Sequence, residues 1–492
     1  MASKRRSKST IVLPNEIWLE IFEKLDSASL LNLTLVCKHW NKLIFSHMAD
    51  RFVLKFDMDQ LKFPQAVSGM VPDRHYRHLC VRSFRLNSLN YLLDIVGQLA
   101  ADLDSLKLCL QMLECQILDQ LLPLCKRLKN LNIKFTYFEH GETIGSQKSV
   151  SSRINSLKLN VQNHASTYKP ISLEKALWPY ISKARQLDIV VHGPQDLDIL
   201  RSMASELKVL KATVDYATVN MFFKLRLPAL TSLDLSVNYQ KYDSATYCET
   251  TEFQQFLGEC KDLKSIFLED CEFDQACLSM IYSSLPKVDT LQLCGYLSRE
   301  SLSLNGIEKM KQLKTLGLPL DVQPEEFYPI VPLYTVEHVS CDDYVGQTLL
   351  LEILRRFPNL KSLTFPINVY EKGLLILILK HAPQLKSLCV FDMKRITQYF
   401  IEDVSQLVSL EALTIKAQFI GRDKFRSLWQ TIILPALRTL KIKTTSDIPD
   451  SISGSVAAKN PLCKLILNKQ LVKPVGRCRS SSNRKRPSTG AA

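Results

Sequence analysis

The chain has 492 residues, with 63 Lys and Arg against 49 Asp and Glu, which gives a formal net charge of +14. Hydrophobic residues make up 46% of the chain, so it has ample apolar surface for a core and is not a wholly disordered protein. The length exceeds what one ordinary core supports, which favours several domains or a repeat architecture. The positive charge favours nucleic acid, an anionic membrane or an acidic partner only if it lies on a folded surface.

The first ten residues carry four basic residues and no acidic one, so we expect a disordered basic terminus. They lead into an apolar segment too short for a signal peptide, and no stretch reaches the roughly 18–20 apolar residues that span a bilayer. The 14 cysteines are scattered without zinc-ligand spacing, so we expect reduced thiols that act as small buried hydrophobes. These features predict a cytoplasmic or nuclear protein with no metal, no cofactor and no membrane partner.

Residues 11–47 contain three short apolar segments at helical spacing. The first follows Pro14, which suits a first helical turn because its missing N–H is not needed there. Two neighbouring stripes of this helix are apolar, Ile17 and Ile21 in one and Trp18, Phe22 and Leu25 in the other. We expect Asp26 to cap a second helix and Trp40 to open the apolar set of a third.

A segment this short cannot bury so much aliphatic surface by itself. It either packs on the rest of the chain or binds a partner, for which helix-on-helix docking is the natural mode. The spacing alone leaves two interpretations equally open: a partner-binding module, and an N-terminal cap of the repeat array that follows it. Residues 48–75 are interpreted as a linker into that array.

An apolar-x-x-apolar-x-apolar motif recurs through residues 76–468, mostly at intervals of about 25 residues. Thirteen clear units begin at Leu103, Leu128, Ile154, Leu207, Leu230, Leu263, Val288, Leu313, Leu360, Leu385, Leu410, Leu437 and Leu462. Three degenerate units begin at Tyr76, Ala184 and Val336. Positions four and six of the motif point to one face of a short strand, and the residues between motifs have helical spacing. A single unit cannot bury its own apolar face, but stacked units can.

Several units also carry a proline two residues before the first leucine, which ends the preceding helix and turns the chain into the strand. This pattern resembles the leucine-rich-repeat family, and the segment from Leu263 to Cys271 matches its cysteine-containing subclass fully. The resemblance implies an α/β fold: a leucine-rich-repeat solenoid with a curved parallel sheet and outer helices, preceded by the small helical module.

The module itself resembles an F-box. The matching residues are Leu13-Pro14, Glu16-Ile17, Ile21-Phe22, Leu25, Leu30 and Val36-Cys37-Lys38 with Trp40. An F-box resemblance implies a three-helix module that binds the Skp adaptor of cullin-type ubiquitin ligases. It places Leu13, Pro14, Ile17, Ile21 and Phe22 at that contact. The wider apolar set of the motif adds Leu25, Leu30, Leu33, Val36, Cys37, Trp40 and Leu43.

The leading hypothesis is therefore a non-catalytic substrate receptor of an SCF-type ubiquitin ligase, whose repeats hold a protein target close to the ubiquitin-loaded enzyme. One alternative is an interaction scaffold without ubiquitin transfer, and another is a nucleic-acid-associated protein. No motif of a catalytic site occurs in the chain, and no homo-oligomer is predicted. Exposed strand positions are candidate target contacts: Lys416, Lys441 and Lys443 as a basic patch for an acidic or phosphorylated segment, and Phe267 and Glu269 in the middle of the array.

The positive charge lies at the two ends of the chain. Residues 1–10 hold +4 and residues 469–492 hold +7, which leaves +3 for residues 11–468. The predicted folded body is thus close to neutral, and this removes most of the support for a nucleic-acid-binding solenoid. We expect a disordered C-terminal tail whose basic run is a candidate nuclear import signal.

Overall fold

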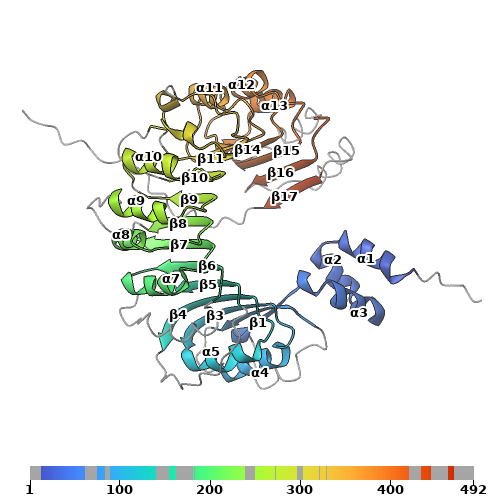
Figure 1. The fold of residues 1–492 in the computed structure, drawn as a ribbon. Helices are drawn as coiled ribbons and strands as arrows, with labels where there is room; N and C mark the ends of the chain where they lie inside the picture. Colours follow the sequence, from blue (N-terminus) through green and yellow to red (C-terminus); the bar gives the residue numbers. More distant parts are fainter. Residues whose placement is uncertain are drawn as a thin grey trace, which may run out of the picture. The chain divides into compact units, whose positions relative to one another are not determined.

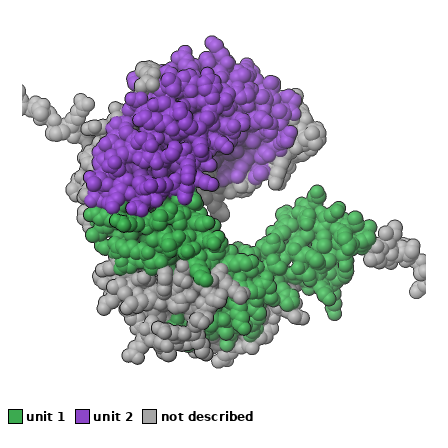
Figure 2. All heavy atoms as spheres, in the orientation of Figure 1, with its two compact units in different colours: residues 1–241 green, residues 242–492 purple. Residues whose placement is uncertain are grey.

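The computed structural model of the chain describes residues 13–60, 75–83, 89–139, 154–161, 181, 183–238, 250–271, 273–295, 303–320, 322–327, 330–419, 434–444 and 464–469. The chain divides into two compact units, residues 1–241 and residues 242–492 (Figures 1 and 2). The predicted N-terminal tail lies outside the described residues, as does the predicted C-terminal tail after its first residue.

The first unit holds a three-helix module and a parallel sheet. Its described helices are α1 (Asn15–Glu23), α2 (Ser27–Leu33), α3 (Lys38–His47), α4 (Leu89–Leu99), α5 (Cys115–Leu121), α7 (Leu197–Met203) and α8 (Val219–Phe223). Its strands are β1 (Val53–Asp57), β2 (His78–Ser83), β3 (Ser105–Glu114), β4 (Asn130–Glu139), β5 (Ser156–Val161), β6 (Gln186–Val191), β7 (Val209–Asp215) and β8 (Ser232–Asn238). Each strand pairs in parallel with the next one along the chain.

The second unit repeats this plan without the helical module. Its strands are β9 (Ser265–Glu269), β10 (Thr290–Cys294), β11 (Thr315–Leu318), β12 (His338–Cys341), β13 (Ser362–Pro366), β14 (Ser387–Arg395), β15 (Ala412–Phe419), β16 (Thr439–Thr444) and β17 (Lys464–Lys469). They too pair in parallel in chain order. The helices α9 (Thr250–Glu259), α10 (Gln275–Ser284), α11 (Gln347–Arg356), α12 (Leu374–His381) and α13 (Gln398–Ser405) cover one face of this sheet (Figure 1).

The strands lie where the repeat motif predicts them. Every clear and degenerate unit, including those that begin at Tyr76, Ala184 and Val336, forms one of the strands from β2 to β17. Positions four and six are buried, as at Leu291 and Leu293 of β10, which are both 0% exposed. The parallel sheet with helices on one face confirms the predicted fold class. The first strand, β1, was not predicted, since it lies within the residues interpreted as a linker.

The helices form where the residues between motifs have helical spacing. In α11 the apolar stripe of Leu349, Ile353 and Leu354 is buried. The prolines that precede the strands, such as Pro286 and Pro358, lie in turns after the helices, as expected from their effect on the preceding residue. Within the described part of the chain, no helix has both the length and the apolar character needed to cross a bilayer.

A repeated backbone contact joins neighbouring units at the start of their strands. The N–H groups of Asp289 and Thr290 both donate to the carbonyl of Lys264, at 2.9 and 3.2 Å. We call this series of shared carbonyls the carbonyl ladder. It continues through Asp289, Lys314, Glu337, Lys361, Lys386 and Glu411 in the second unit, and through Arg77, Asp104, Lys129, Asn155, Arg185 and Lys208 in the first.

The side chains of the carbonyl ladder often carry opposite charges on neighbouring repeats. Lys361 donates to Glu337 at 2.6 Å, and Lys386 and Glu411 lie 3.0 Å apart. The hydrogen bond from Lys361 lowers the pKa of Glu337, and the bond from Lys386 lowers the pKa of Glu411. The same positions that fix the backbone register therefore also match charges between repeats.

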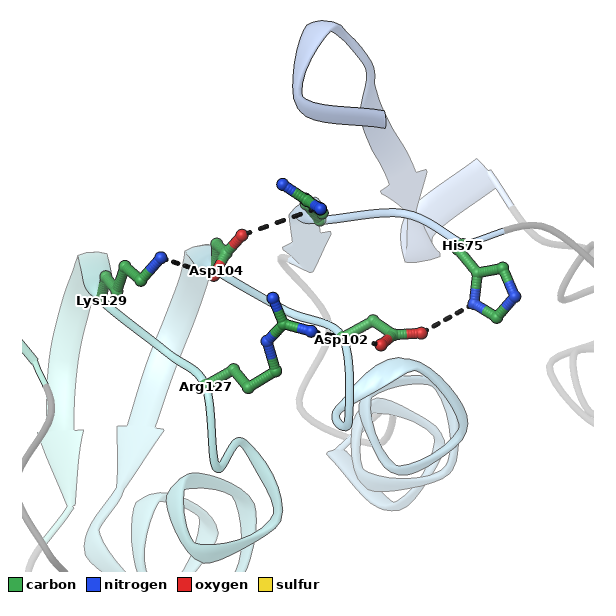
Figure 3. A network of polar contacts seen from close by, with 6 residues as sticks. His75, Asp102, Asp104, Arg127 and Lys129 are labelled. Atoms are coloured by element: carbon green, nitrogen blue, oxygen red, sulfur yellow. Dashed lines mark hydrogen bonds and ion pairs between the residues drawn. The ribbon is translucent and has the colours of Figure 1, made fainter. Parts of the chain in front are cut away.

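The first rungs of the ladder carry a network of ion pairs (Figure 3). Asp104 lies 3.2 Å from Lys129 and 3.9 Å from Arg77, and its side chain is only 12% exposed. Asp102 lies 2.7 Å from His75 and 3.9 Å from Arg127, but its side chain is 42% exposed. Two aspartates separated by one residue thus connect three repeats. Asp104 is nearly buried, and Asp102 is in contact with solvent.

We expect Asp104→Ala to destabilise the first unit by about 1–2 kcal/mol, because it removes a nearly buried carboxylate that forms ion pairs with two cations. Asp102→Ala is the matched control, and its more exposed pairs predict a loss below about 1 kcal/mol. Denaturant unfolding of both variants measures the difference. Equal effects of the two substitutions would show that burial does not govern this network.

Candidate functional site

The three-helix module begins with short-range capping contacts that follow from its sequence. Pro14 is the N-cap of α1, one position before the first helical turn. Asp26 caps α2 and accepts a 2.7 Å hydrogen bond from the Ser29 N–H, which lowers the pKa of the Asp26 carboxyl. The sulfur of Cys37 accepts from the Trp40 N–H at 3.4 Å and caps α3. These caps set the ends of the three helices close to where the sequence predicts them.

An aromatic cluster forms the centre of the module. The rings of Trp18 and Trp40 lie 4.6 Å apart, and each lies within 6 Å of the ring of Phe22. Arg51 donates to the carbonyls of Phe22 and Leu25, so its charge lies at the C-terminal end of α1, where the helix dipole favours a cation. The predicted stripe of Trp18, Phe22 and Leu25 therefore faces inward.

Other apolar side chains of the module remain in contact with solvent. Ile17 and Ile21, the second predicted stripe of α1, are 41% and 40% exposed. Leu31 of α2 is 41% exposed, and Leu35 and Val36, which follow that helix, are 77% and 62% exposed. We call these five residues the exposed apolar set. A module this small leaves them outside its core, so they are free to bind a partner.

The predicted adaptor-binding residues divide between this surface and the core. Pro14, Ile17, Ile21, Val36 and Cys37 are exposed, whereas Leu13, Leu25, Leu33 and Trp40 are half-buried. Phe22, Leu30 and Leu43 are buried, with exposures of 0%, 0% and 7%, and belong to the core of the module. Those three side chains stabilise the module rather than form its surface. Leu31 and Leu35 are exposed but were not among the predicted residues.

A second candidate site lies on the helix-free face of the second unit. Lys416 of β15 is paired in register with Lys443 of β16, and Lys441 lies two residues before Lys443. The ammonium of Lys416 lies 5.2 Å from the centre of the Phe391 ring. No carboxylate among the residues that the structure describes forms an ion pair with these three lysines. We call Lys416, Lys441 and Lys443 the lysine patch.

The charges of the lysine patch affect the pKa of the neighbouring Cys389 thiol. Burial raises the pKa of Cys389, and the charges of Lys416, Lys441 and Lys443 oppose that shift. The structure thus brings the three predicted lysines together around one point. It does not bring them to the other two predicted target contacts, because Phe267 and Glu269 lie on β9, six strands away from β15 along the pairing order.

Two lysines of the first unit, at the motif position that Lys441 occupies, behave differently. Lys158 of β5 forms an ion pair with Asp188 of β6, and Lys211 of β7 forms one with Asp234 of β8. Their charges are therefore neutralised within the sheet, unlike those of the lysine patch. In the described residues, no group of three or more His, Cys, Asp and Glu side chains is arranged to hold a metal ion.

Comparison with known proteins locates one family segment. Residues 11–51 match the family model described as F-box-like, which covers the three-helix module and ends at Arg51. A search of curated proteins found no match to the chain.

Three solved structures have partly similar backbones. A leucine-rich-repeat protein of Leptospira interrogans is 16% identical, and the match covers 79% of this chain and 95% of that one, with a TM-score of 0.38. A TLR13–ssRNA13 complex is 12% identical, with coverage of 86% of this chain and 72% of that one and a TM-score of 0.37. A mouse RP105/MD-1 complex is 12% identical, with coverage of 75% of this chain and 64% of that one and a TM-score of 0.35. At these TM-scores none of the three bears on what this chain binds. The repeat motif and the parallel sheet of the chain itself define its leucine-rich-repeat architecture, and this architecture follows an F-box-like segment at residues 11–51.

Proposed function

We propose that the chain is the substrate-recognition subunit of an SCF-type ubiquitin ligase. The observation that carries this proposal is the F-box-like module with its exposed apolar set, on the same chain as a long parallel sheet with a helix-free face. The module docks on a Skp-family adaptor and, through it, on a cullin. The sheet holds a protein target, and the chain itself is non-catalytic. It acts in the cytoplasm, the nucleus or both.

The exposed apolar set supports this assignment energetically. Apolar side chains that become buried at an interface contribute about 25 cal/mol per Å² of buried area, and interfaces concentrate their binding energy in a few such anchors. Leu35 and Val36 are the most exposed of the set, at 77% and 62%. They have little to contribute to the stability of the isolated module, so their role is best explained by a partner.

We expect Leu35→Asp/Val36→Asp to weaken binding to a purified Skp-family adaptor by at least about 100-fold, because two carboxylates would be buried without partners. Val408→Asp is the matched control, since Val408 is 55% exposed in the second unit. Isothermal titration calorimetry measures both affinities. Adaptor affinity unchanged by the double substitution would remove the proposed docking surface.

A second experiment separates the ligase subunit from a scaffold that lacks ubiquitin transfer. Wild type and a Leu13→Ala/Pro14→Ala form are purified from cells with the proteasome inhibited, and their partners are compared. A ligase subunit loses adaptor and cullin in the variant while its targets remain, and those targets accumulate when the cullin is blocked. Recovery of neither adaptor nor cullin with the wild type would contradict the proposal.

The lysine patch is the part of the sheet that we assign to the target. Its three ammonium groups have no carboxylate partner among the described residues, and charge-assisted hydrogen bonds to a carboxylate or phosphate are about twice as strong as neutral ones. An acidic or phosphorylated target segment is the ligand that these charges favour.

A further inference from the structure

A pocket lies beside the lysine patch, at the ends of two strands of the second unit. It has a volume of about 120 Å³ and is lined by residues that follow β12, by the last residue of β13 and by the turn from β13 into α12. Its walls include Val345, Ile367 and Leu374, and its rim includes Tyr344 and Val369, which are 53% and 71% exposed. A pocket of this size accepts one side chain of a bound peptide.

Buried hydrogen bonds hold one wall of this pocket in place. The hydroxyl of Tyr370 donates to Asp403, and the same carboxylate accepts from the Gly373 N–H at 2.8 Å. The Leu375 N–H in turn donates to the Tyr370 hydroxyl at 3.2 Å. Tyr370 and Asp403 are 5% and 4% exposed. The turn between β13 and α12 is therefore pre-organised, which reduces the entropy lost when a ligand binds.

The polar groups of the pocket select a cationic donor. The Oδ1 atom of Asn368 is buried, and no donor among the described residues lies within hydrogen-bond distance of it. Glu371 lies on the lining. Burial raises the pKa of the Tyr344 hydroxyl, and the nearby carboxylates of Asp392 and Asp343 raise it further. Two cations are nearby: Lys372 lies over the Tyr399 ring, and the backbone N–H of Lys394 donates to the Asn368 carbonyl.

An arginine side chain fits this combination of groups. Its aliphatic stem suits the apolar walls, and its planar guanidinium stacks on an aromatic ring such as that of Tyr344. It also supplies a donor to Asn368 Oδ1 and a positive charge beside Glu371. An aliphatic side chain would fill the same space but leave the Asn368 oxygen unpaired, which is unfavourable.

A continuous row of side-chain positions connects the pocket to the lysine patch. Pro366 lines the pocket and is paired in register with Phe391 of β14. The Phe391 ring lies under Lys416, which is paired with Lys443. Neighbouring strands are about 4.8 Å apart, so Pro366 and Lys443 are separated by about 14 Å. An extended peptide advances about 3.3 Å per residue and covers this distance in about four residues.

We propose that the second unit binds an extended target segment at two points, with an arginine in the pocket and a carboxylate or phosphate about four residues away on the lysine patch. The inference rests on the proposed function, because it specifies the target segment that the sheet holds. The segment crosses β13 to β16 on the helix-free face. Its acidic site binds lysines that form no ion pair with a described carboxylate, and its arginine binds beside the Asn368 Oδ1 atom, which no described donor reaches.

The test uses purified full-length chain on an array of synthetic 12-residue Gly/Ser peptides. Each peptide carries one arginine and one acidic site, either Glu-Glu or phosphoserine, separated by zero to eight residues. We expect binding to peak at a separation of about three to five residues, at least tenfold above peptides that lack either charge. The Glu-Glu and phosphoserine arms distinguish a carboxylate from a phosphate. Binding that ignores the separation, or no binding to any peptide, would overturn the inference.

Variants of the pocket and of the lysine patch show which charge of the peptide each of them binds. Tyr344→Ala/Asn368→Ala should abolish the preference for arginine, and Lys416→Glu/Lys443→Glu should abolish the preference for the acidic site. Lys380→Glu, on the outer helix α12, is the matched charge-reversal control. Adaptor affinity is measured on the same preparations. Peptide binding that fails while adaptor binding persists overturns this inference alone, whereas lost adaptor binding with intact peptide binding overturns the proposed docking alone.

Discussion

Phe22→Ala is expected to unfold the three-helix module while the second unit stays folded. Phe22 is 0% exposed and its ring contacts both Trp18 and Trp40. Removing a buried phenylalanine costs about 3–5 kcal/mol, and a module of this size has only about that much stability in total. Amide hydrogen exchange should therefore become fast across α1 to α3 and remain slow in β9 and β10.

Ile17→Ala is the control for that experiment, because Ile17 lies on the same helix but is 41% exposed. It should leave exchange in the module nearly unchanged, and it should still weaken adaptor binding if the exposed apolar set forms the contact. Slow exchange throughout the module of Phe22→Ala would mean that the aromatic cluster is not its centre.

Gly295→Ala is expected to destabilise the second unit by about 2–4 kcal/mol. Gly295 has a φ angle of 71°, in the left-handed region that disfavours side chains. A Cβ atom there would lie 1.9 Å from the Asp270 Oδ1 atom and 3.1 Å from the Asp270 backbone nitrogen. The residue also joins separate repeats, since its N–H donates to Asp342 at 3.2 Å and its carbonyl accepts from Leu320 at 3.1 Å.

Gly258→Ala in α9 is the matched control, because no atom lies within 4 Å of the position that its Cβ would take. Alanine is favoured over glycine in a helix by about 0.5–1 kcal/mol, so this variant should be more stable than wild type. Thermal unfolding measures both. Compared with Asp270→Gly alone, Asp270→Gly/Gly295→Ala should still lose stability, since it removes the Oδ1 contact but keeps the close backbone nitrogen and the left-handed backbone. Equal midpoints for the two alanine variants would contradict the argument.

Much of the sheet could be predicted because its chemistry is periodic. Leucine at fixed positions of each repeat is enough to locate β2 to β17, since stacking requires the same side chain to point inward every time. The strand β1 was missed because it lacks the leucine that opens the motif. The alternation of Phe52, Leu54 and Phe56 has the period of a strand, but it is not part of a repeated motif.

The candidate sites were less predictable because exposure is a tertiary property. The two stripes of α1 could be separated by spacing, but nothing in the residue type of Leu31 or Leu35 indicates that it faces solvent while Leu30 is buried. Similarly, three lysines could be placed on neighbouring strands from the motif alone. The pocket beside them depends on turn residues from two repeats, Tyr344 and Asn368 among them, which share no motif.

The charges of the carbonyl ladder determine which repeats can be removed without bringing like charges together. Along Lys264, Asp289, Lys314, Glu337 and Lys361 the sign of the charge changes at every repeat. Loss of residues 290–314 would place Asp289 beside Glu337, whereas loss of residues 290–337 would place it beside Lys361. Within this stretch, removal of two repeats therefore keeps opposite charges side by side, whereas removal of one repeat brings two carboxylates together.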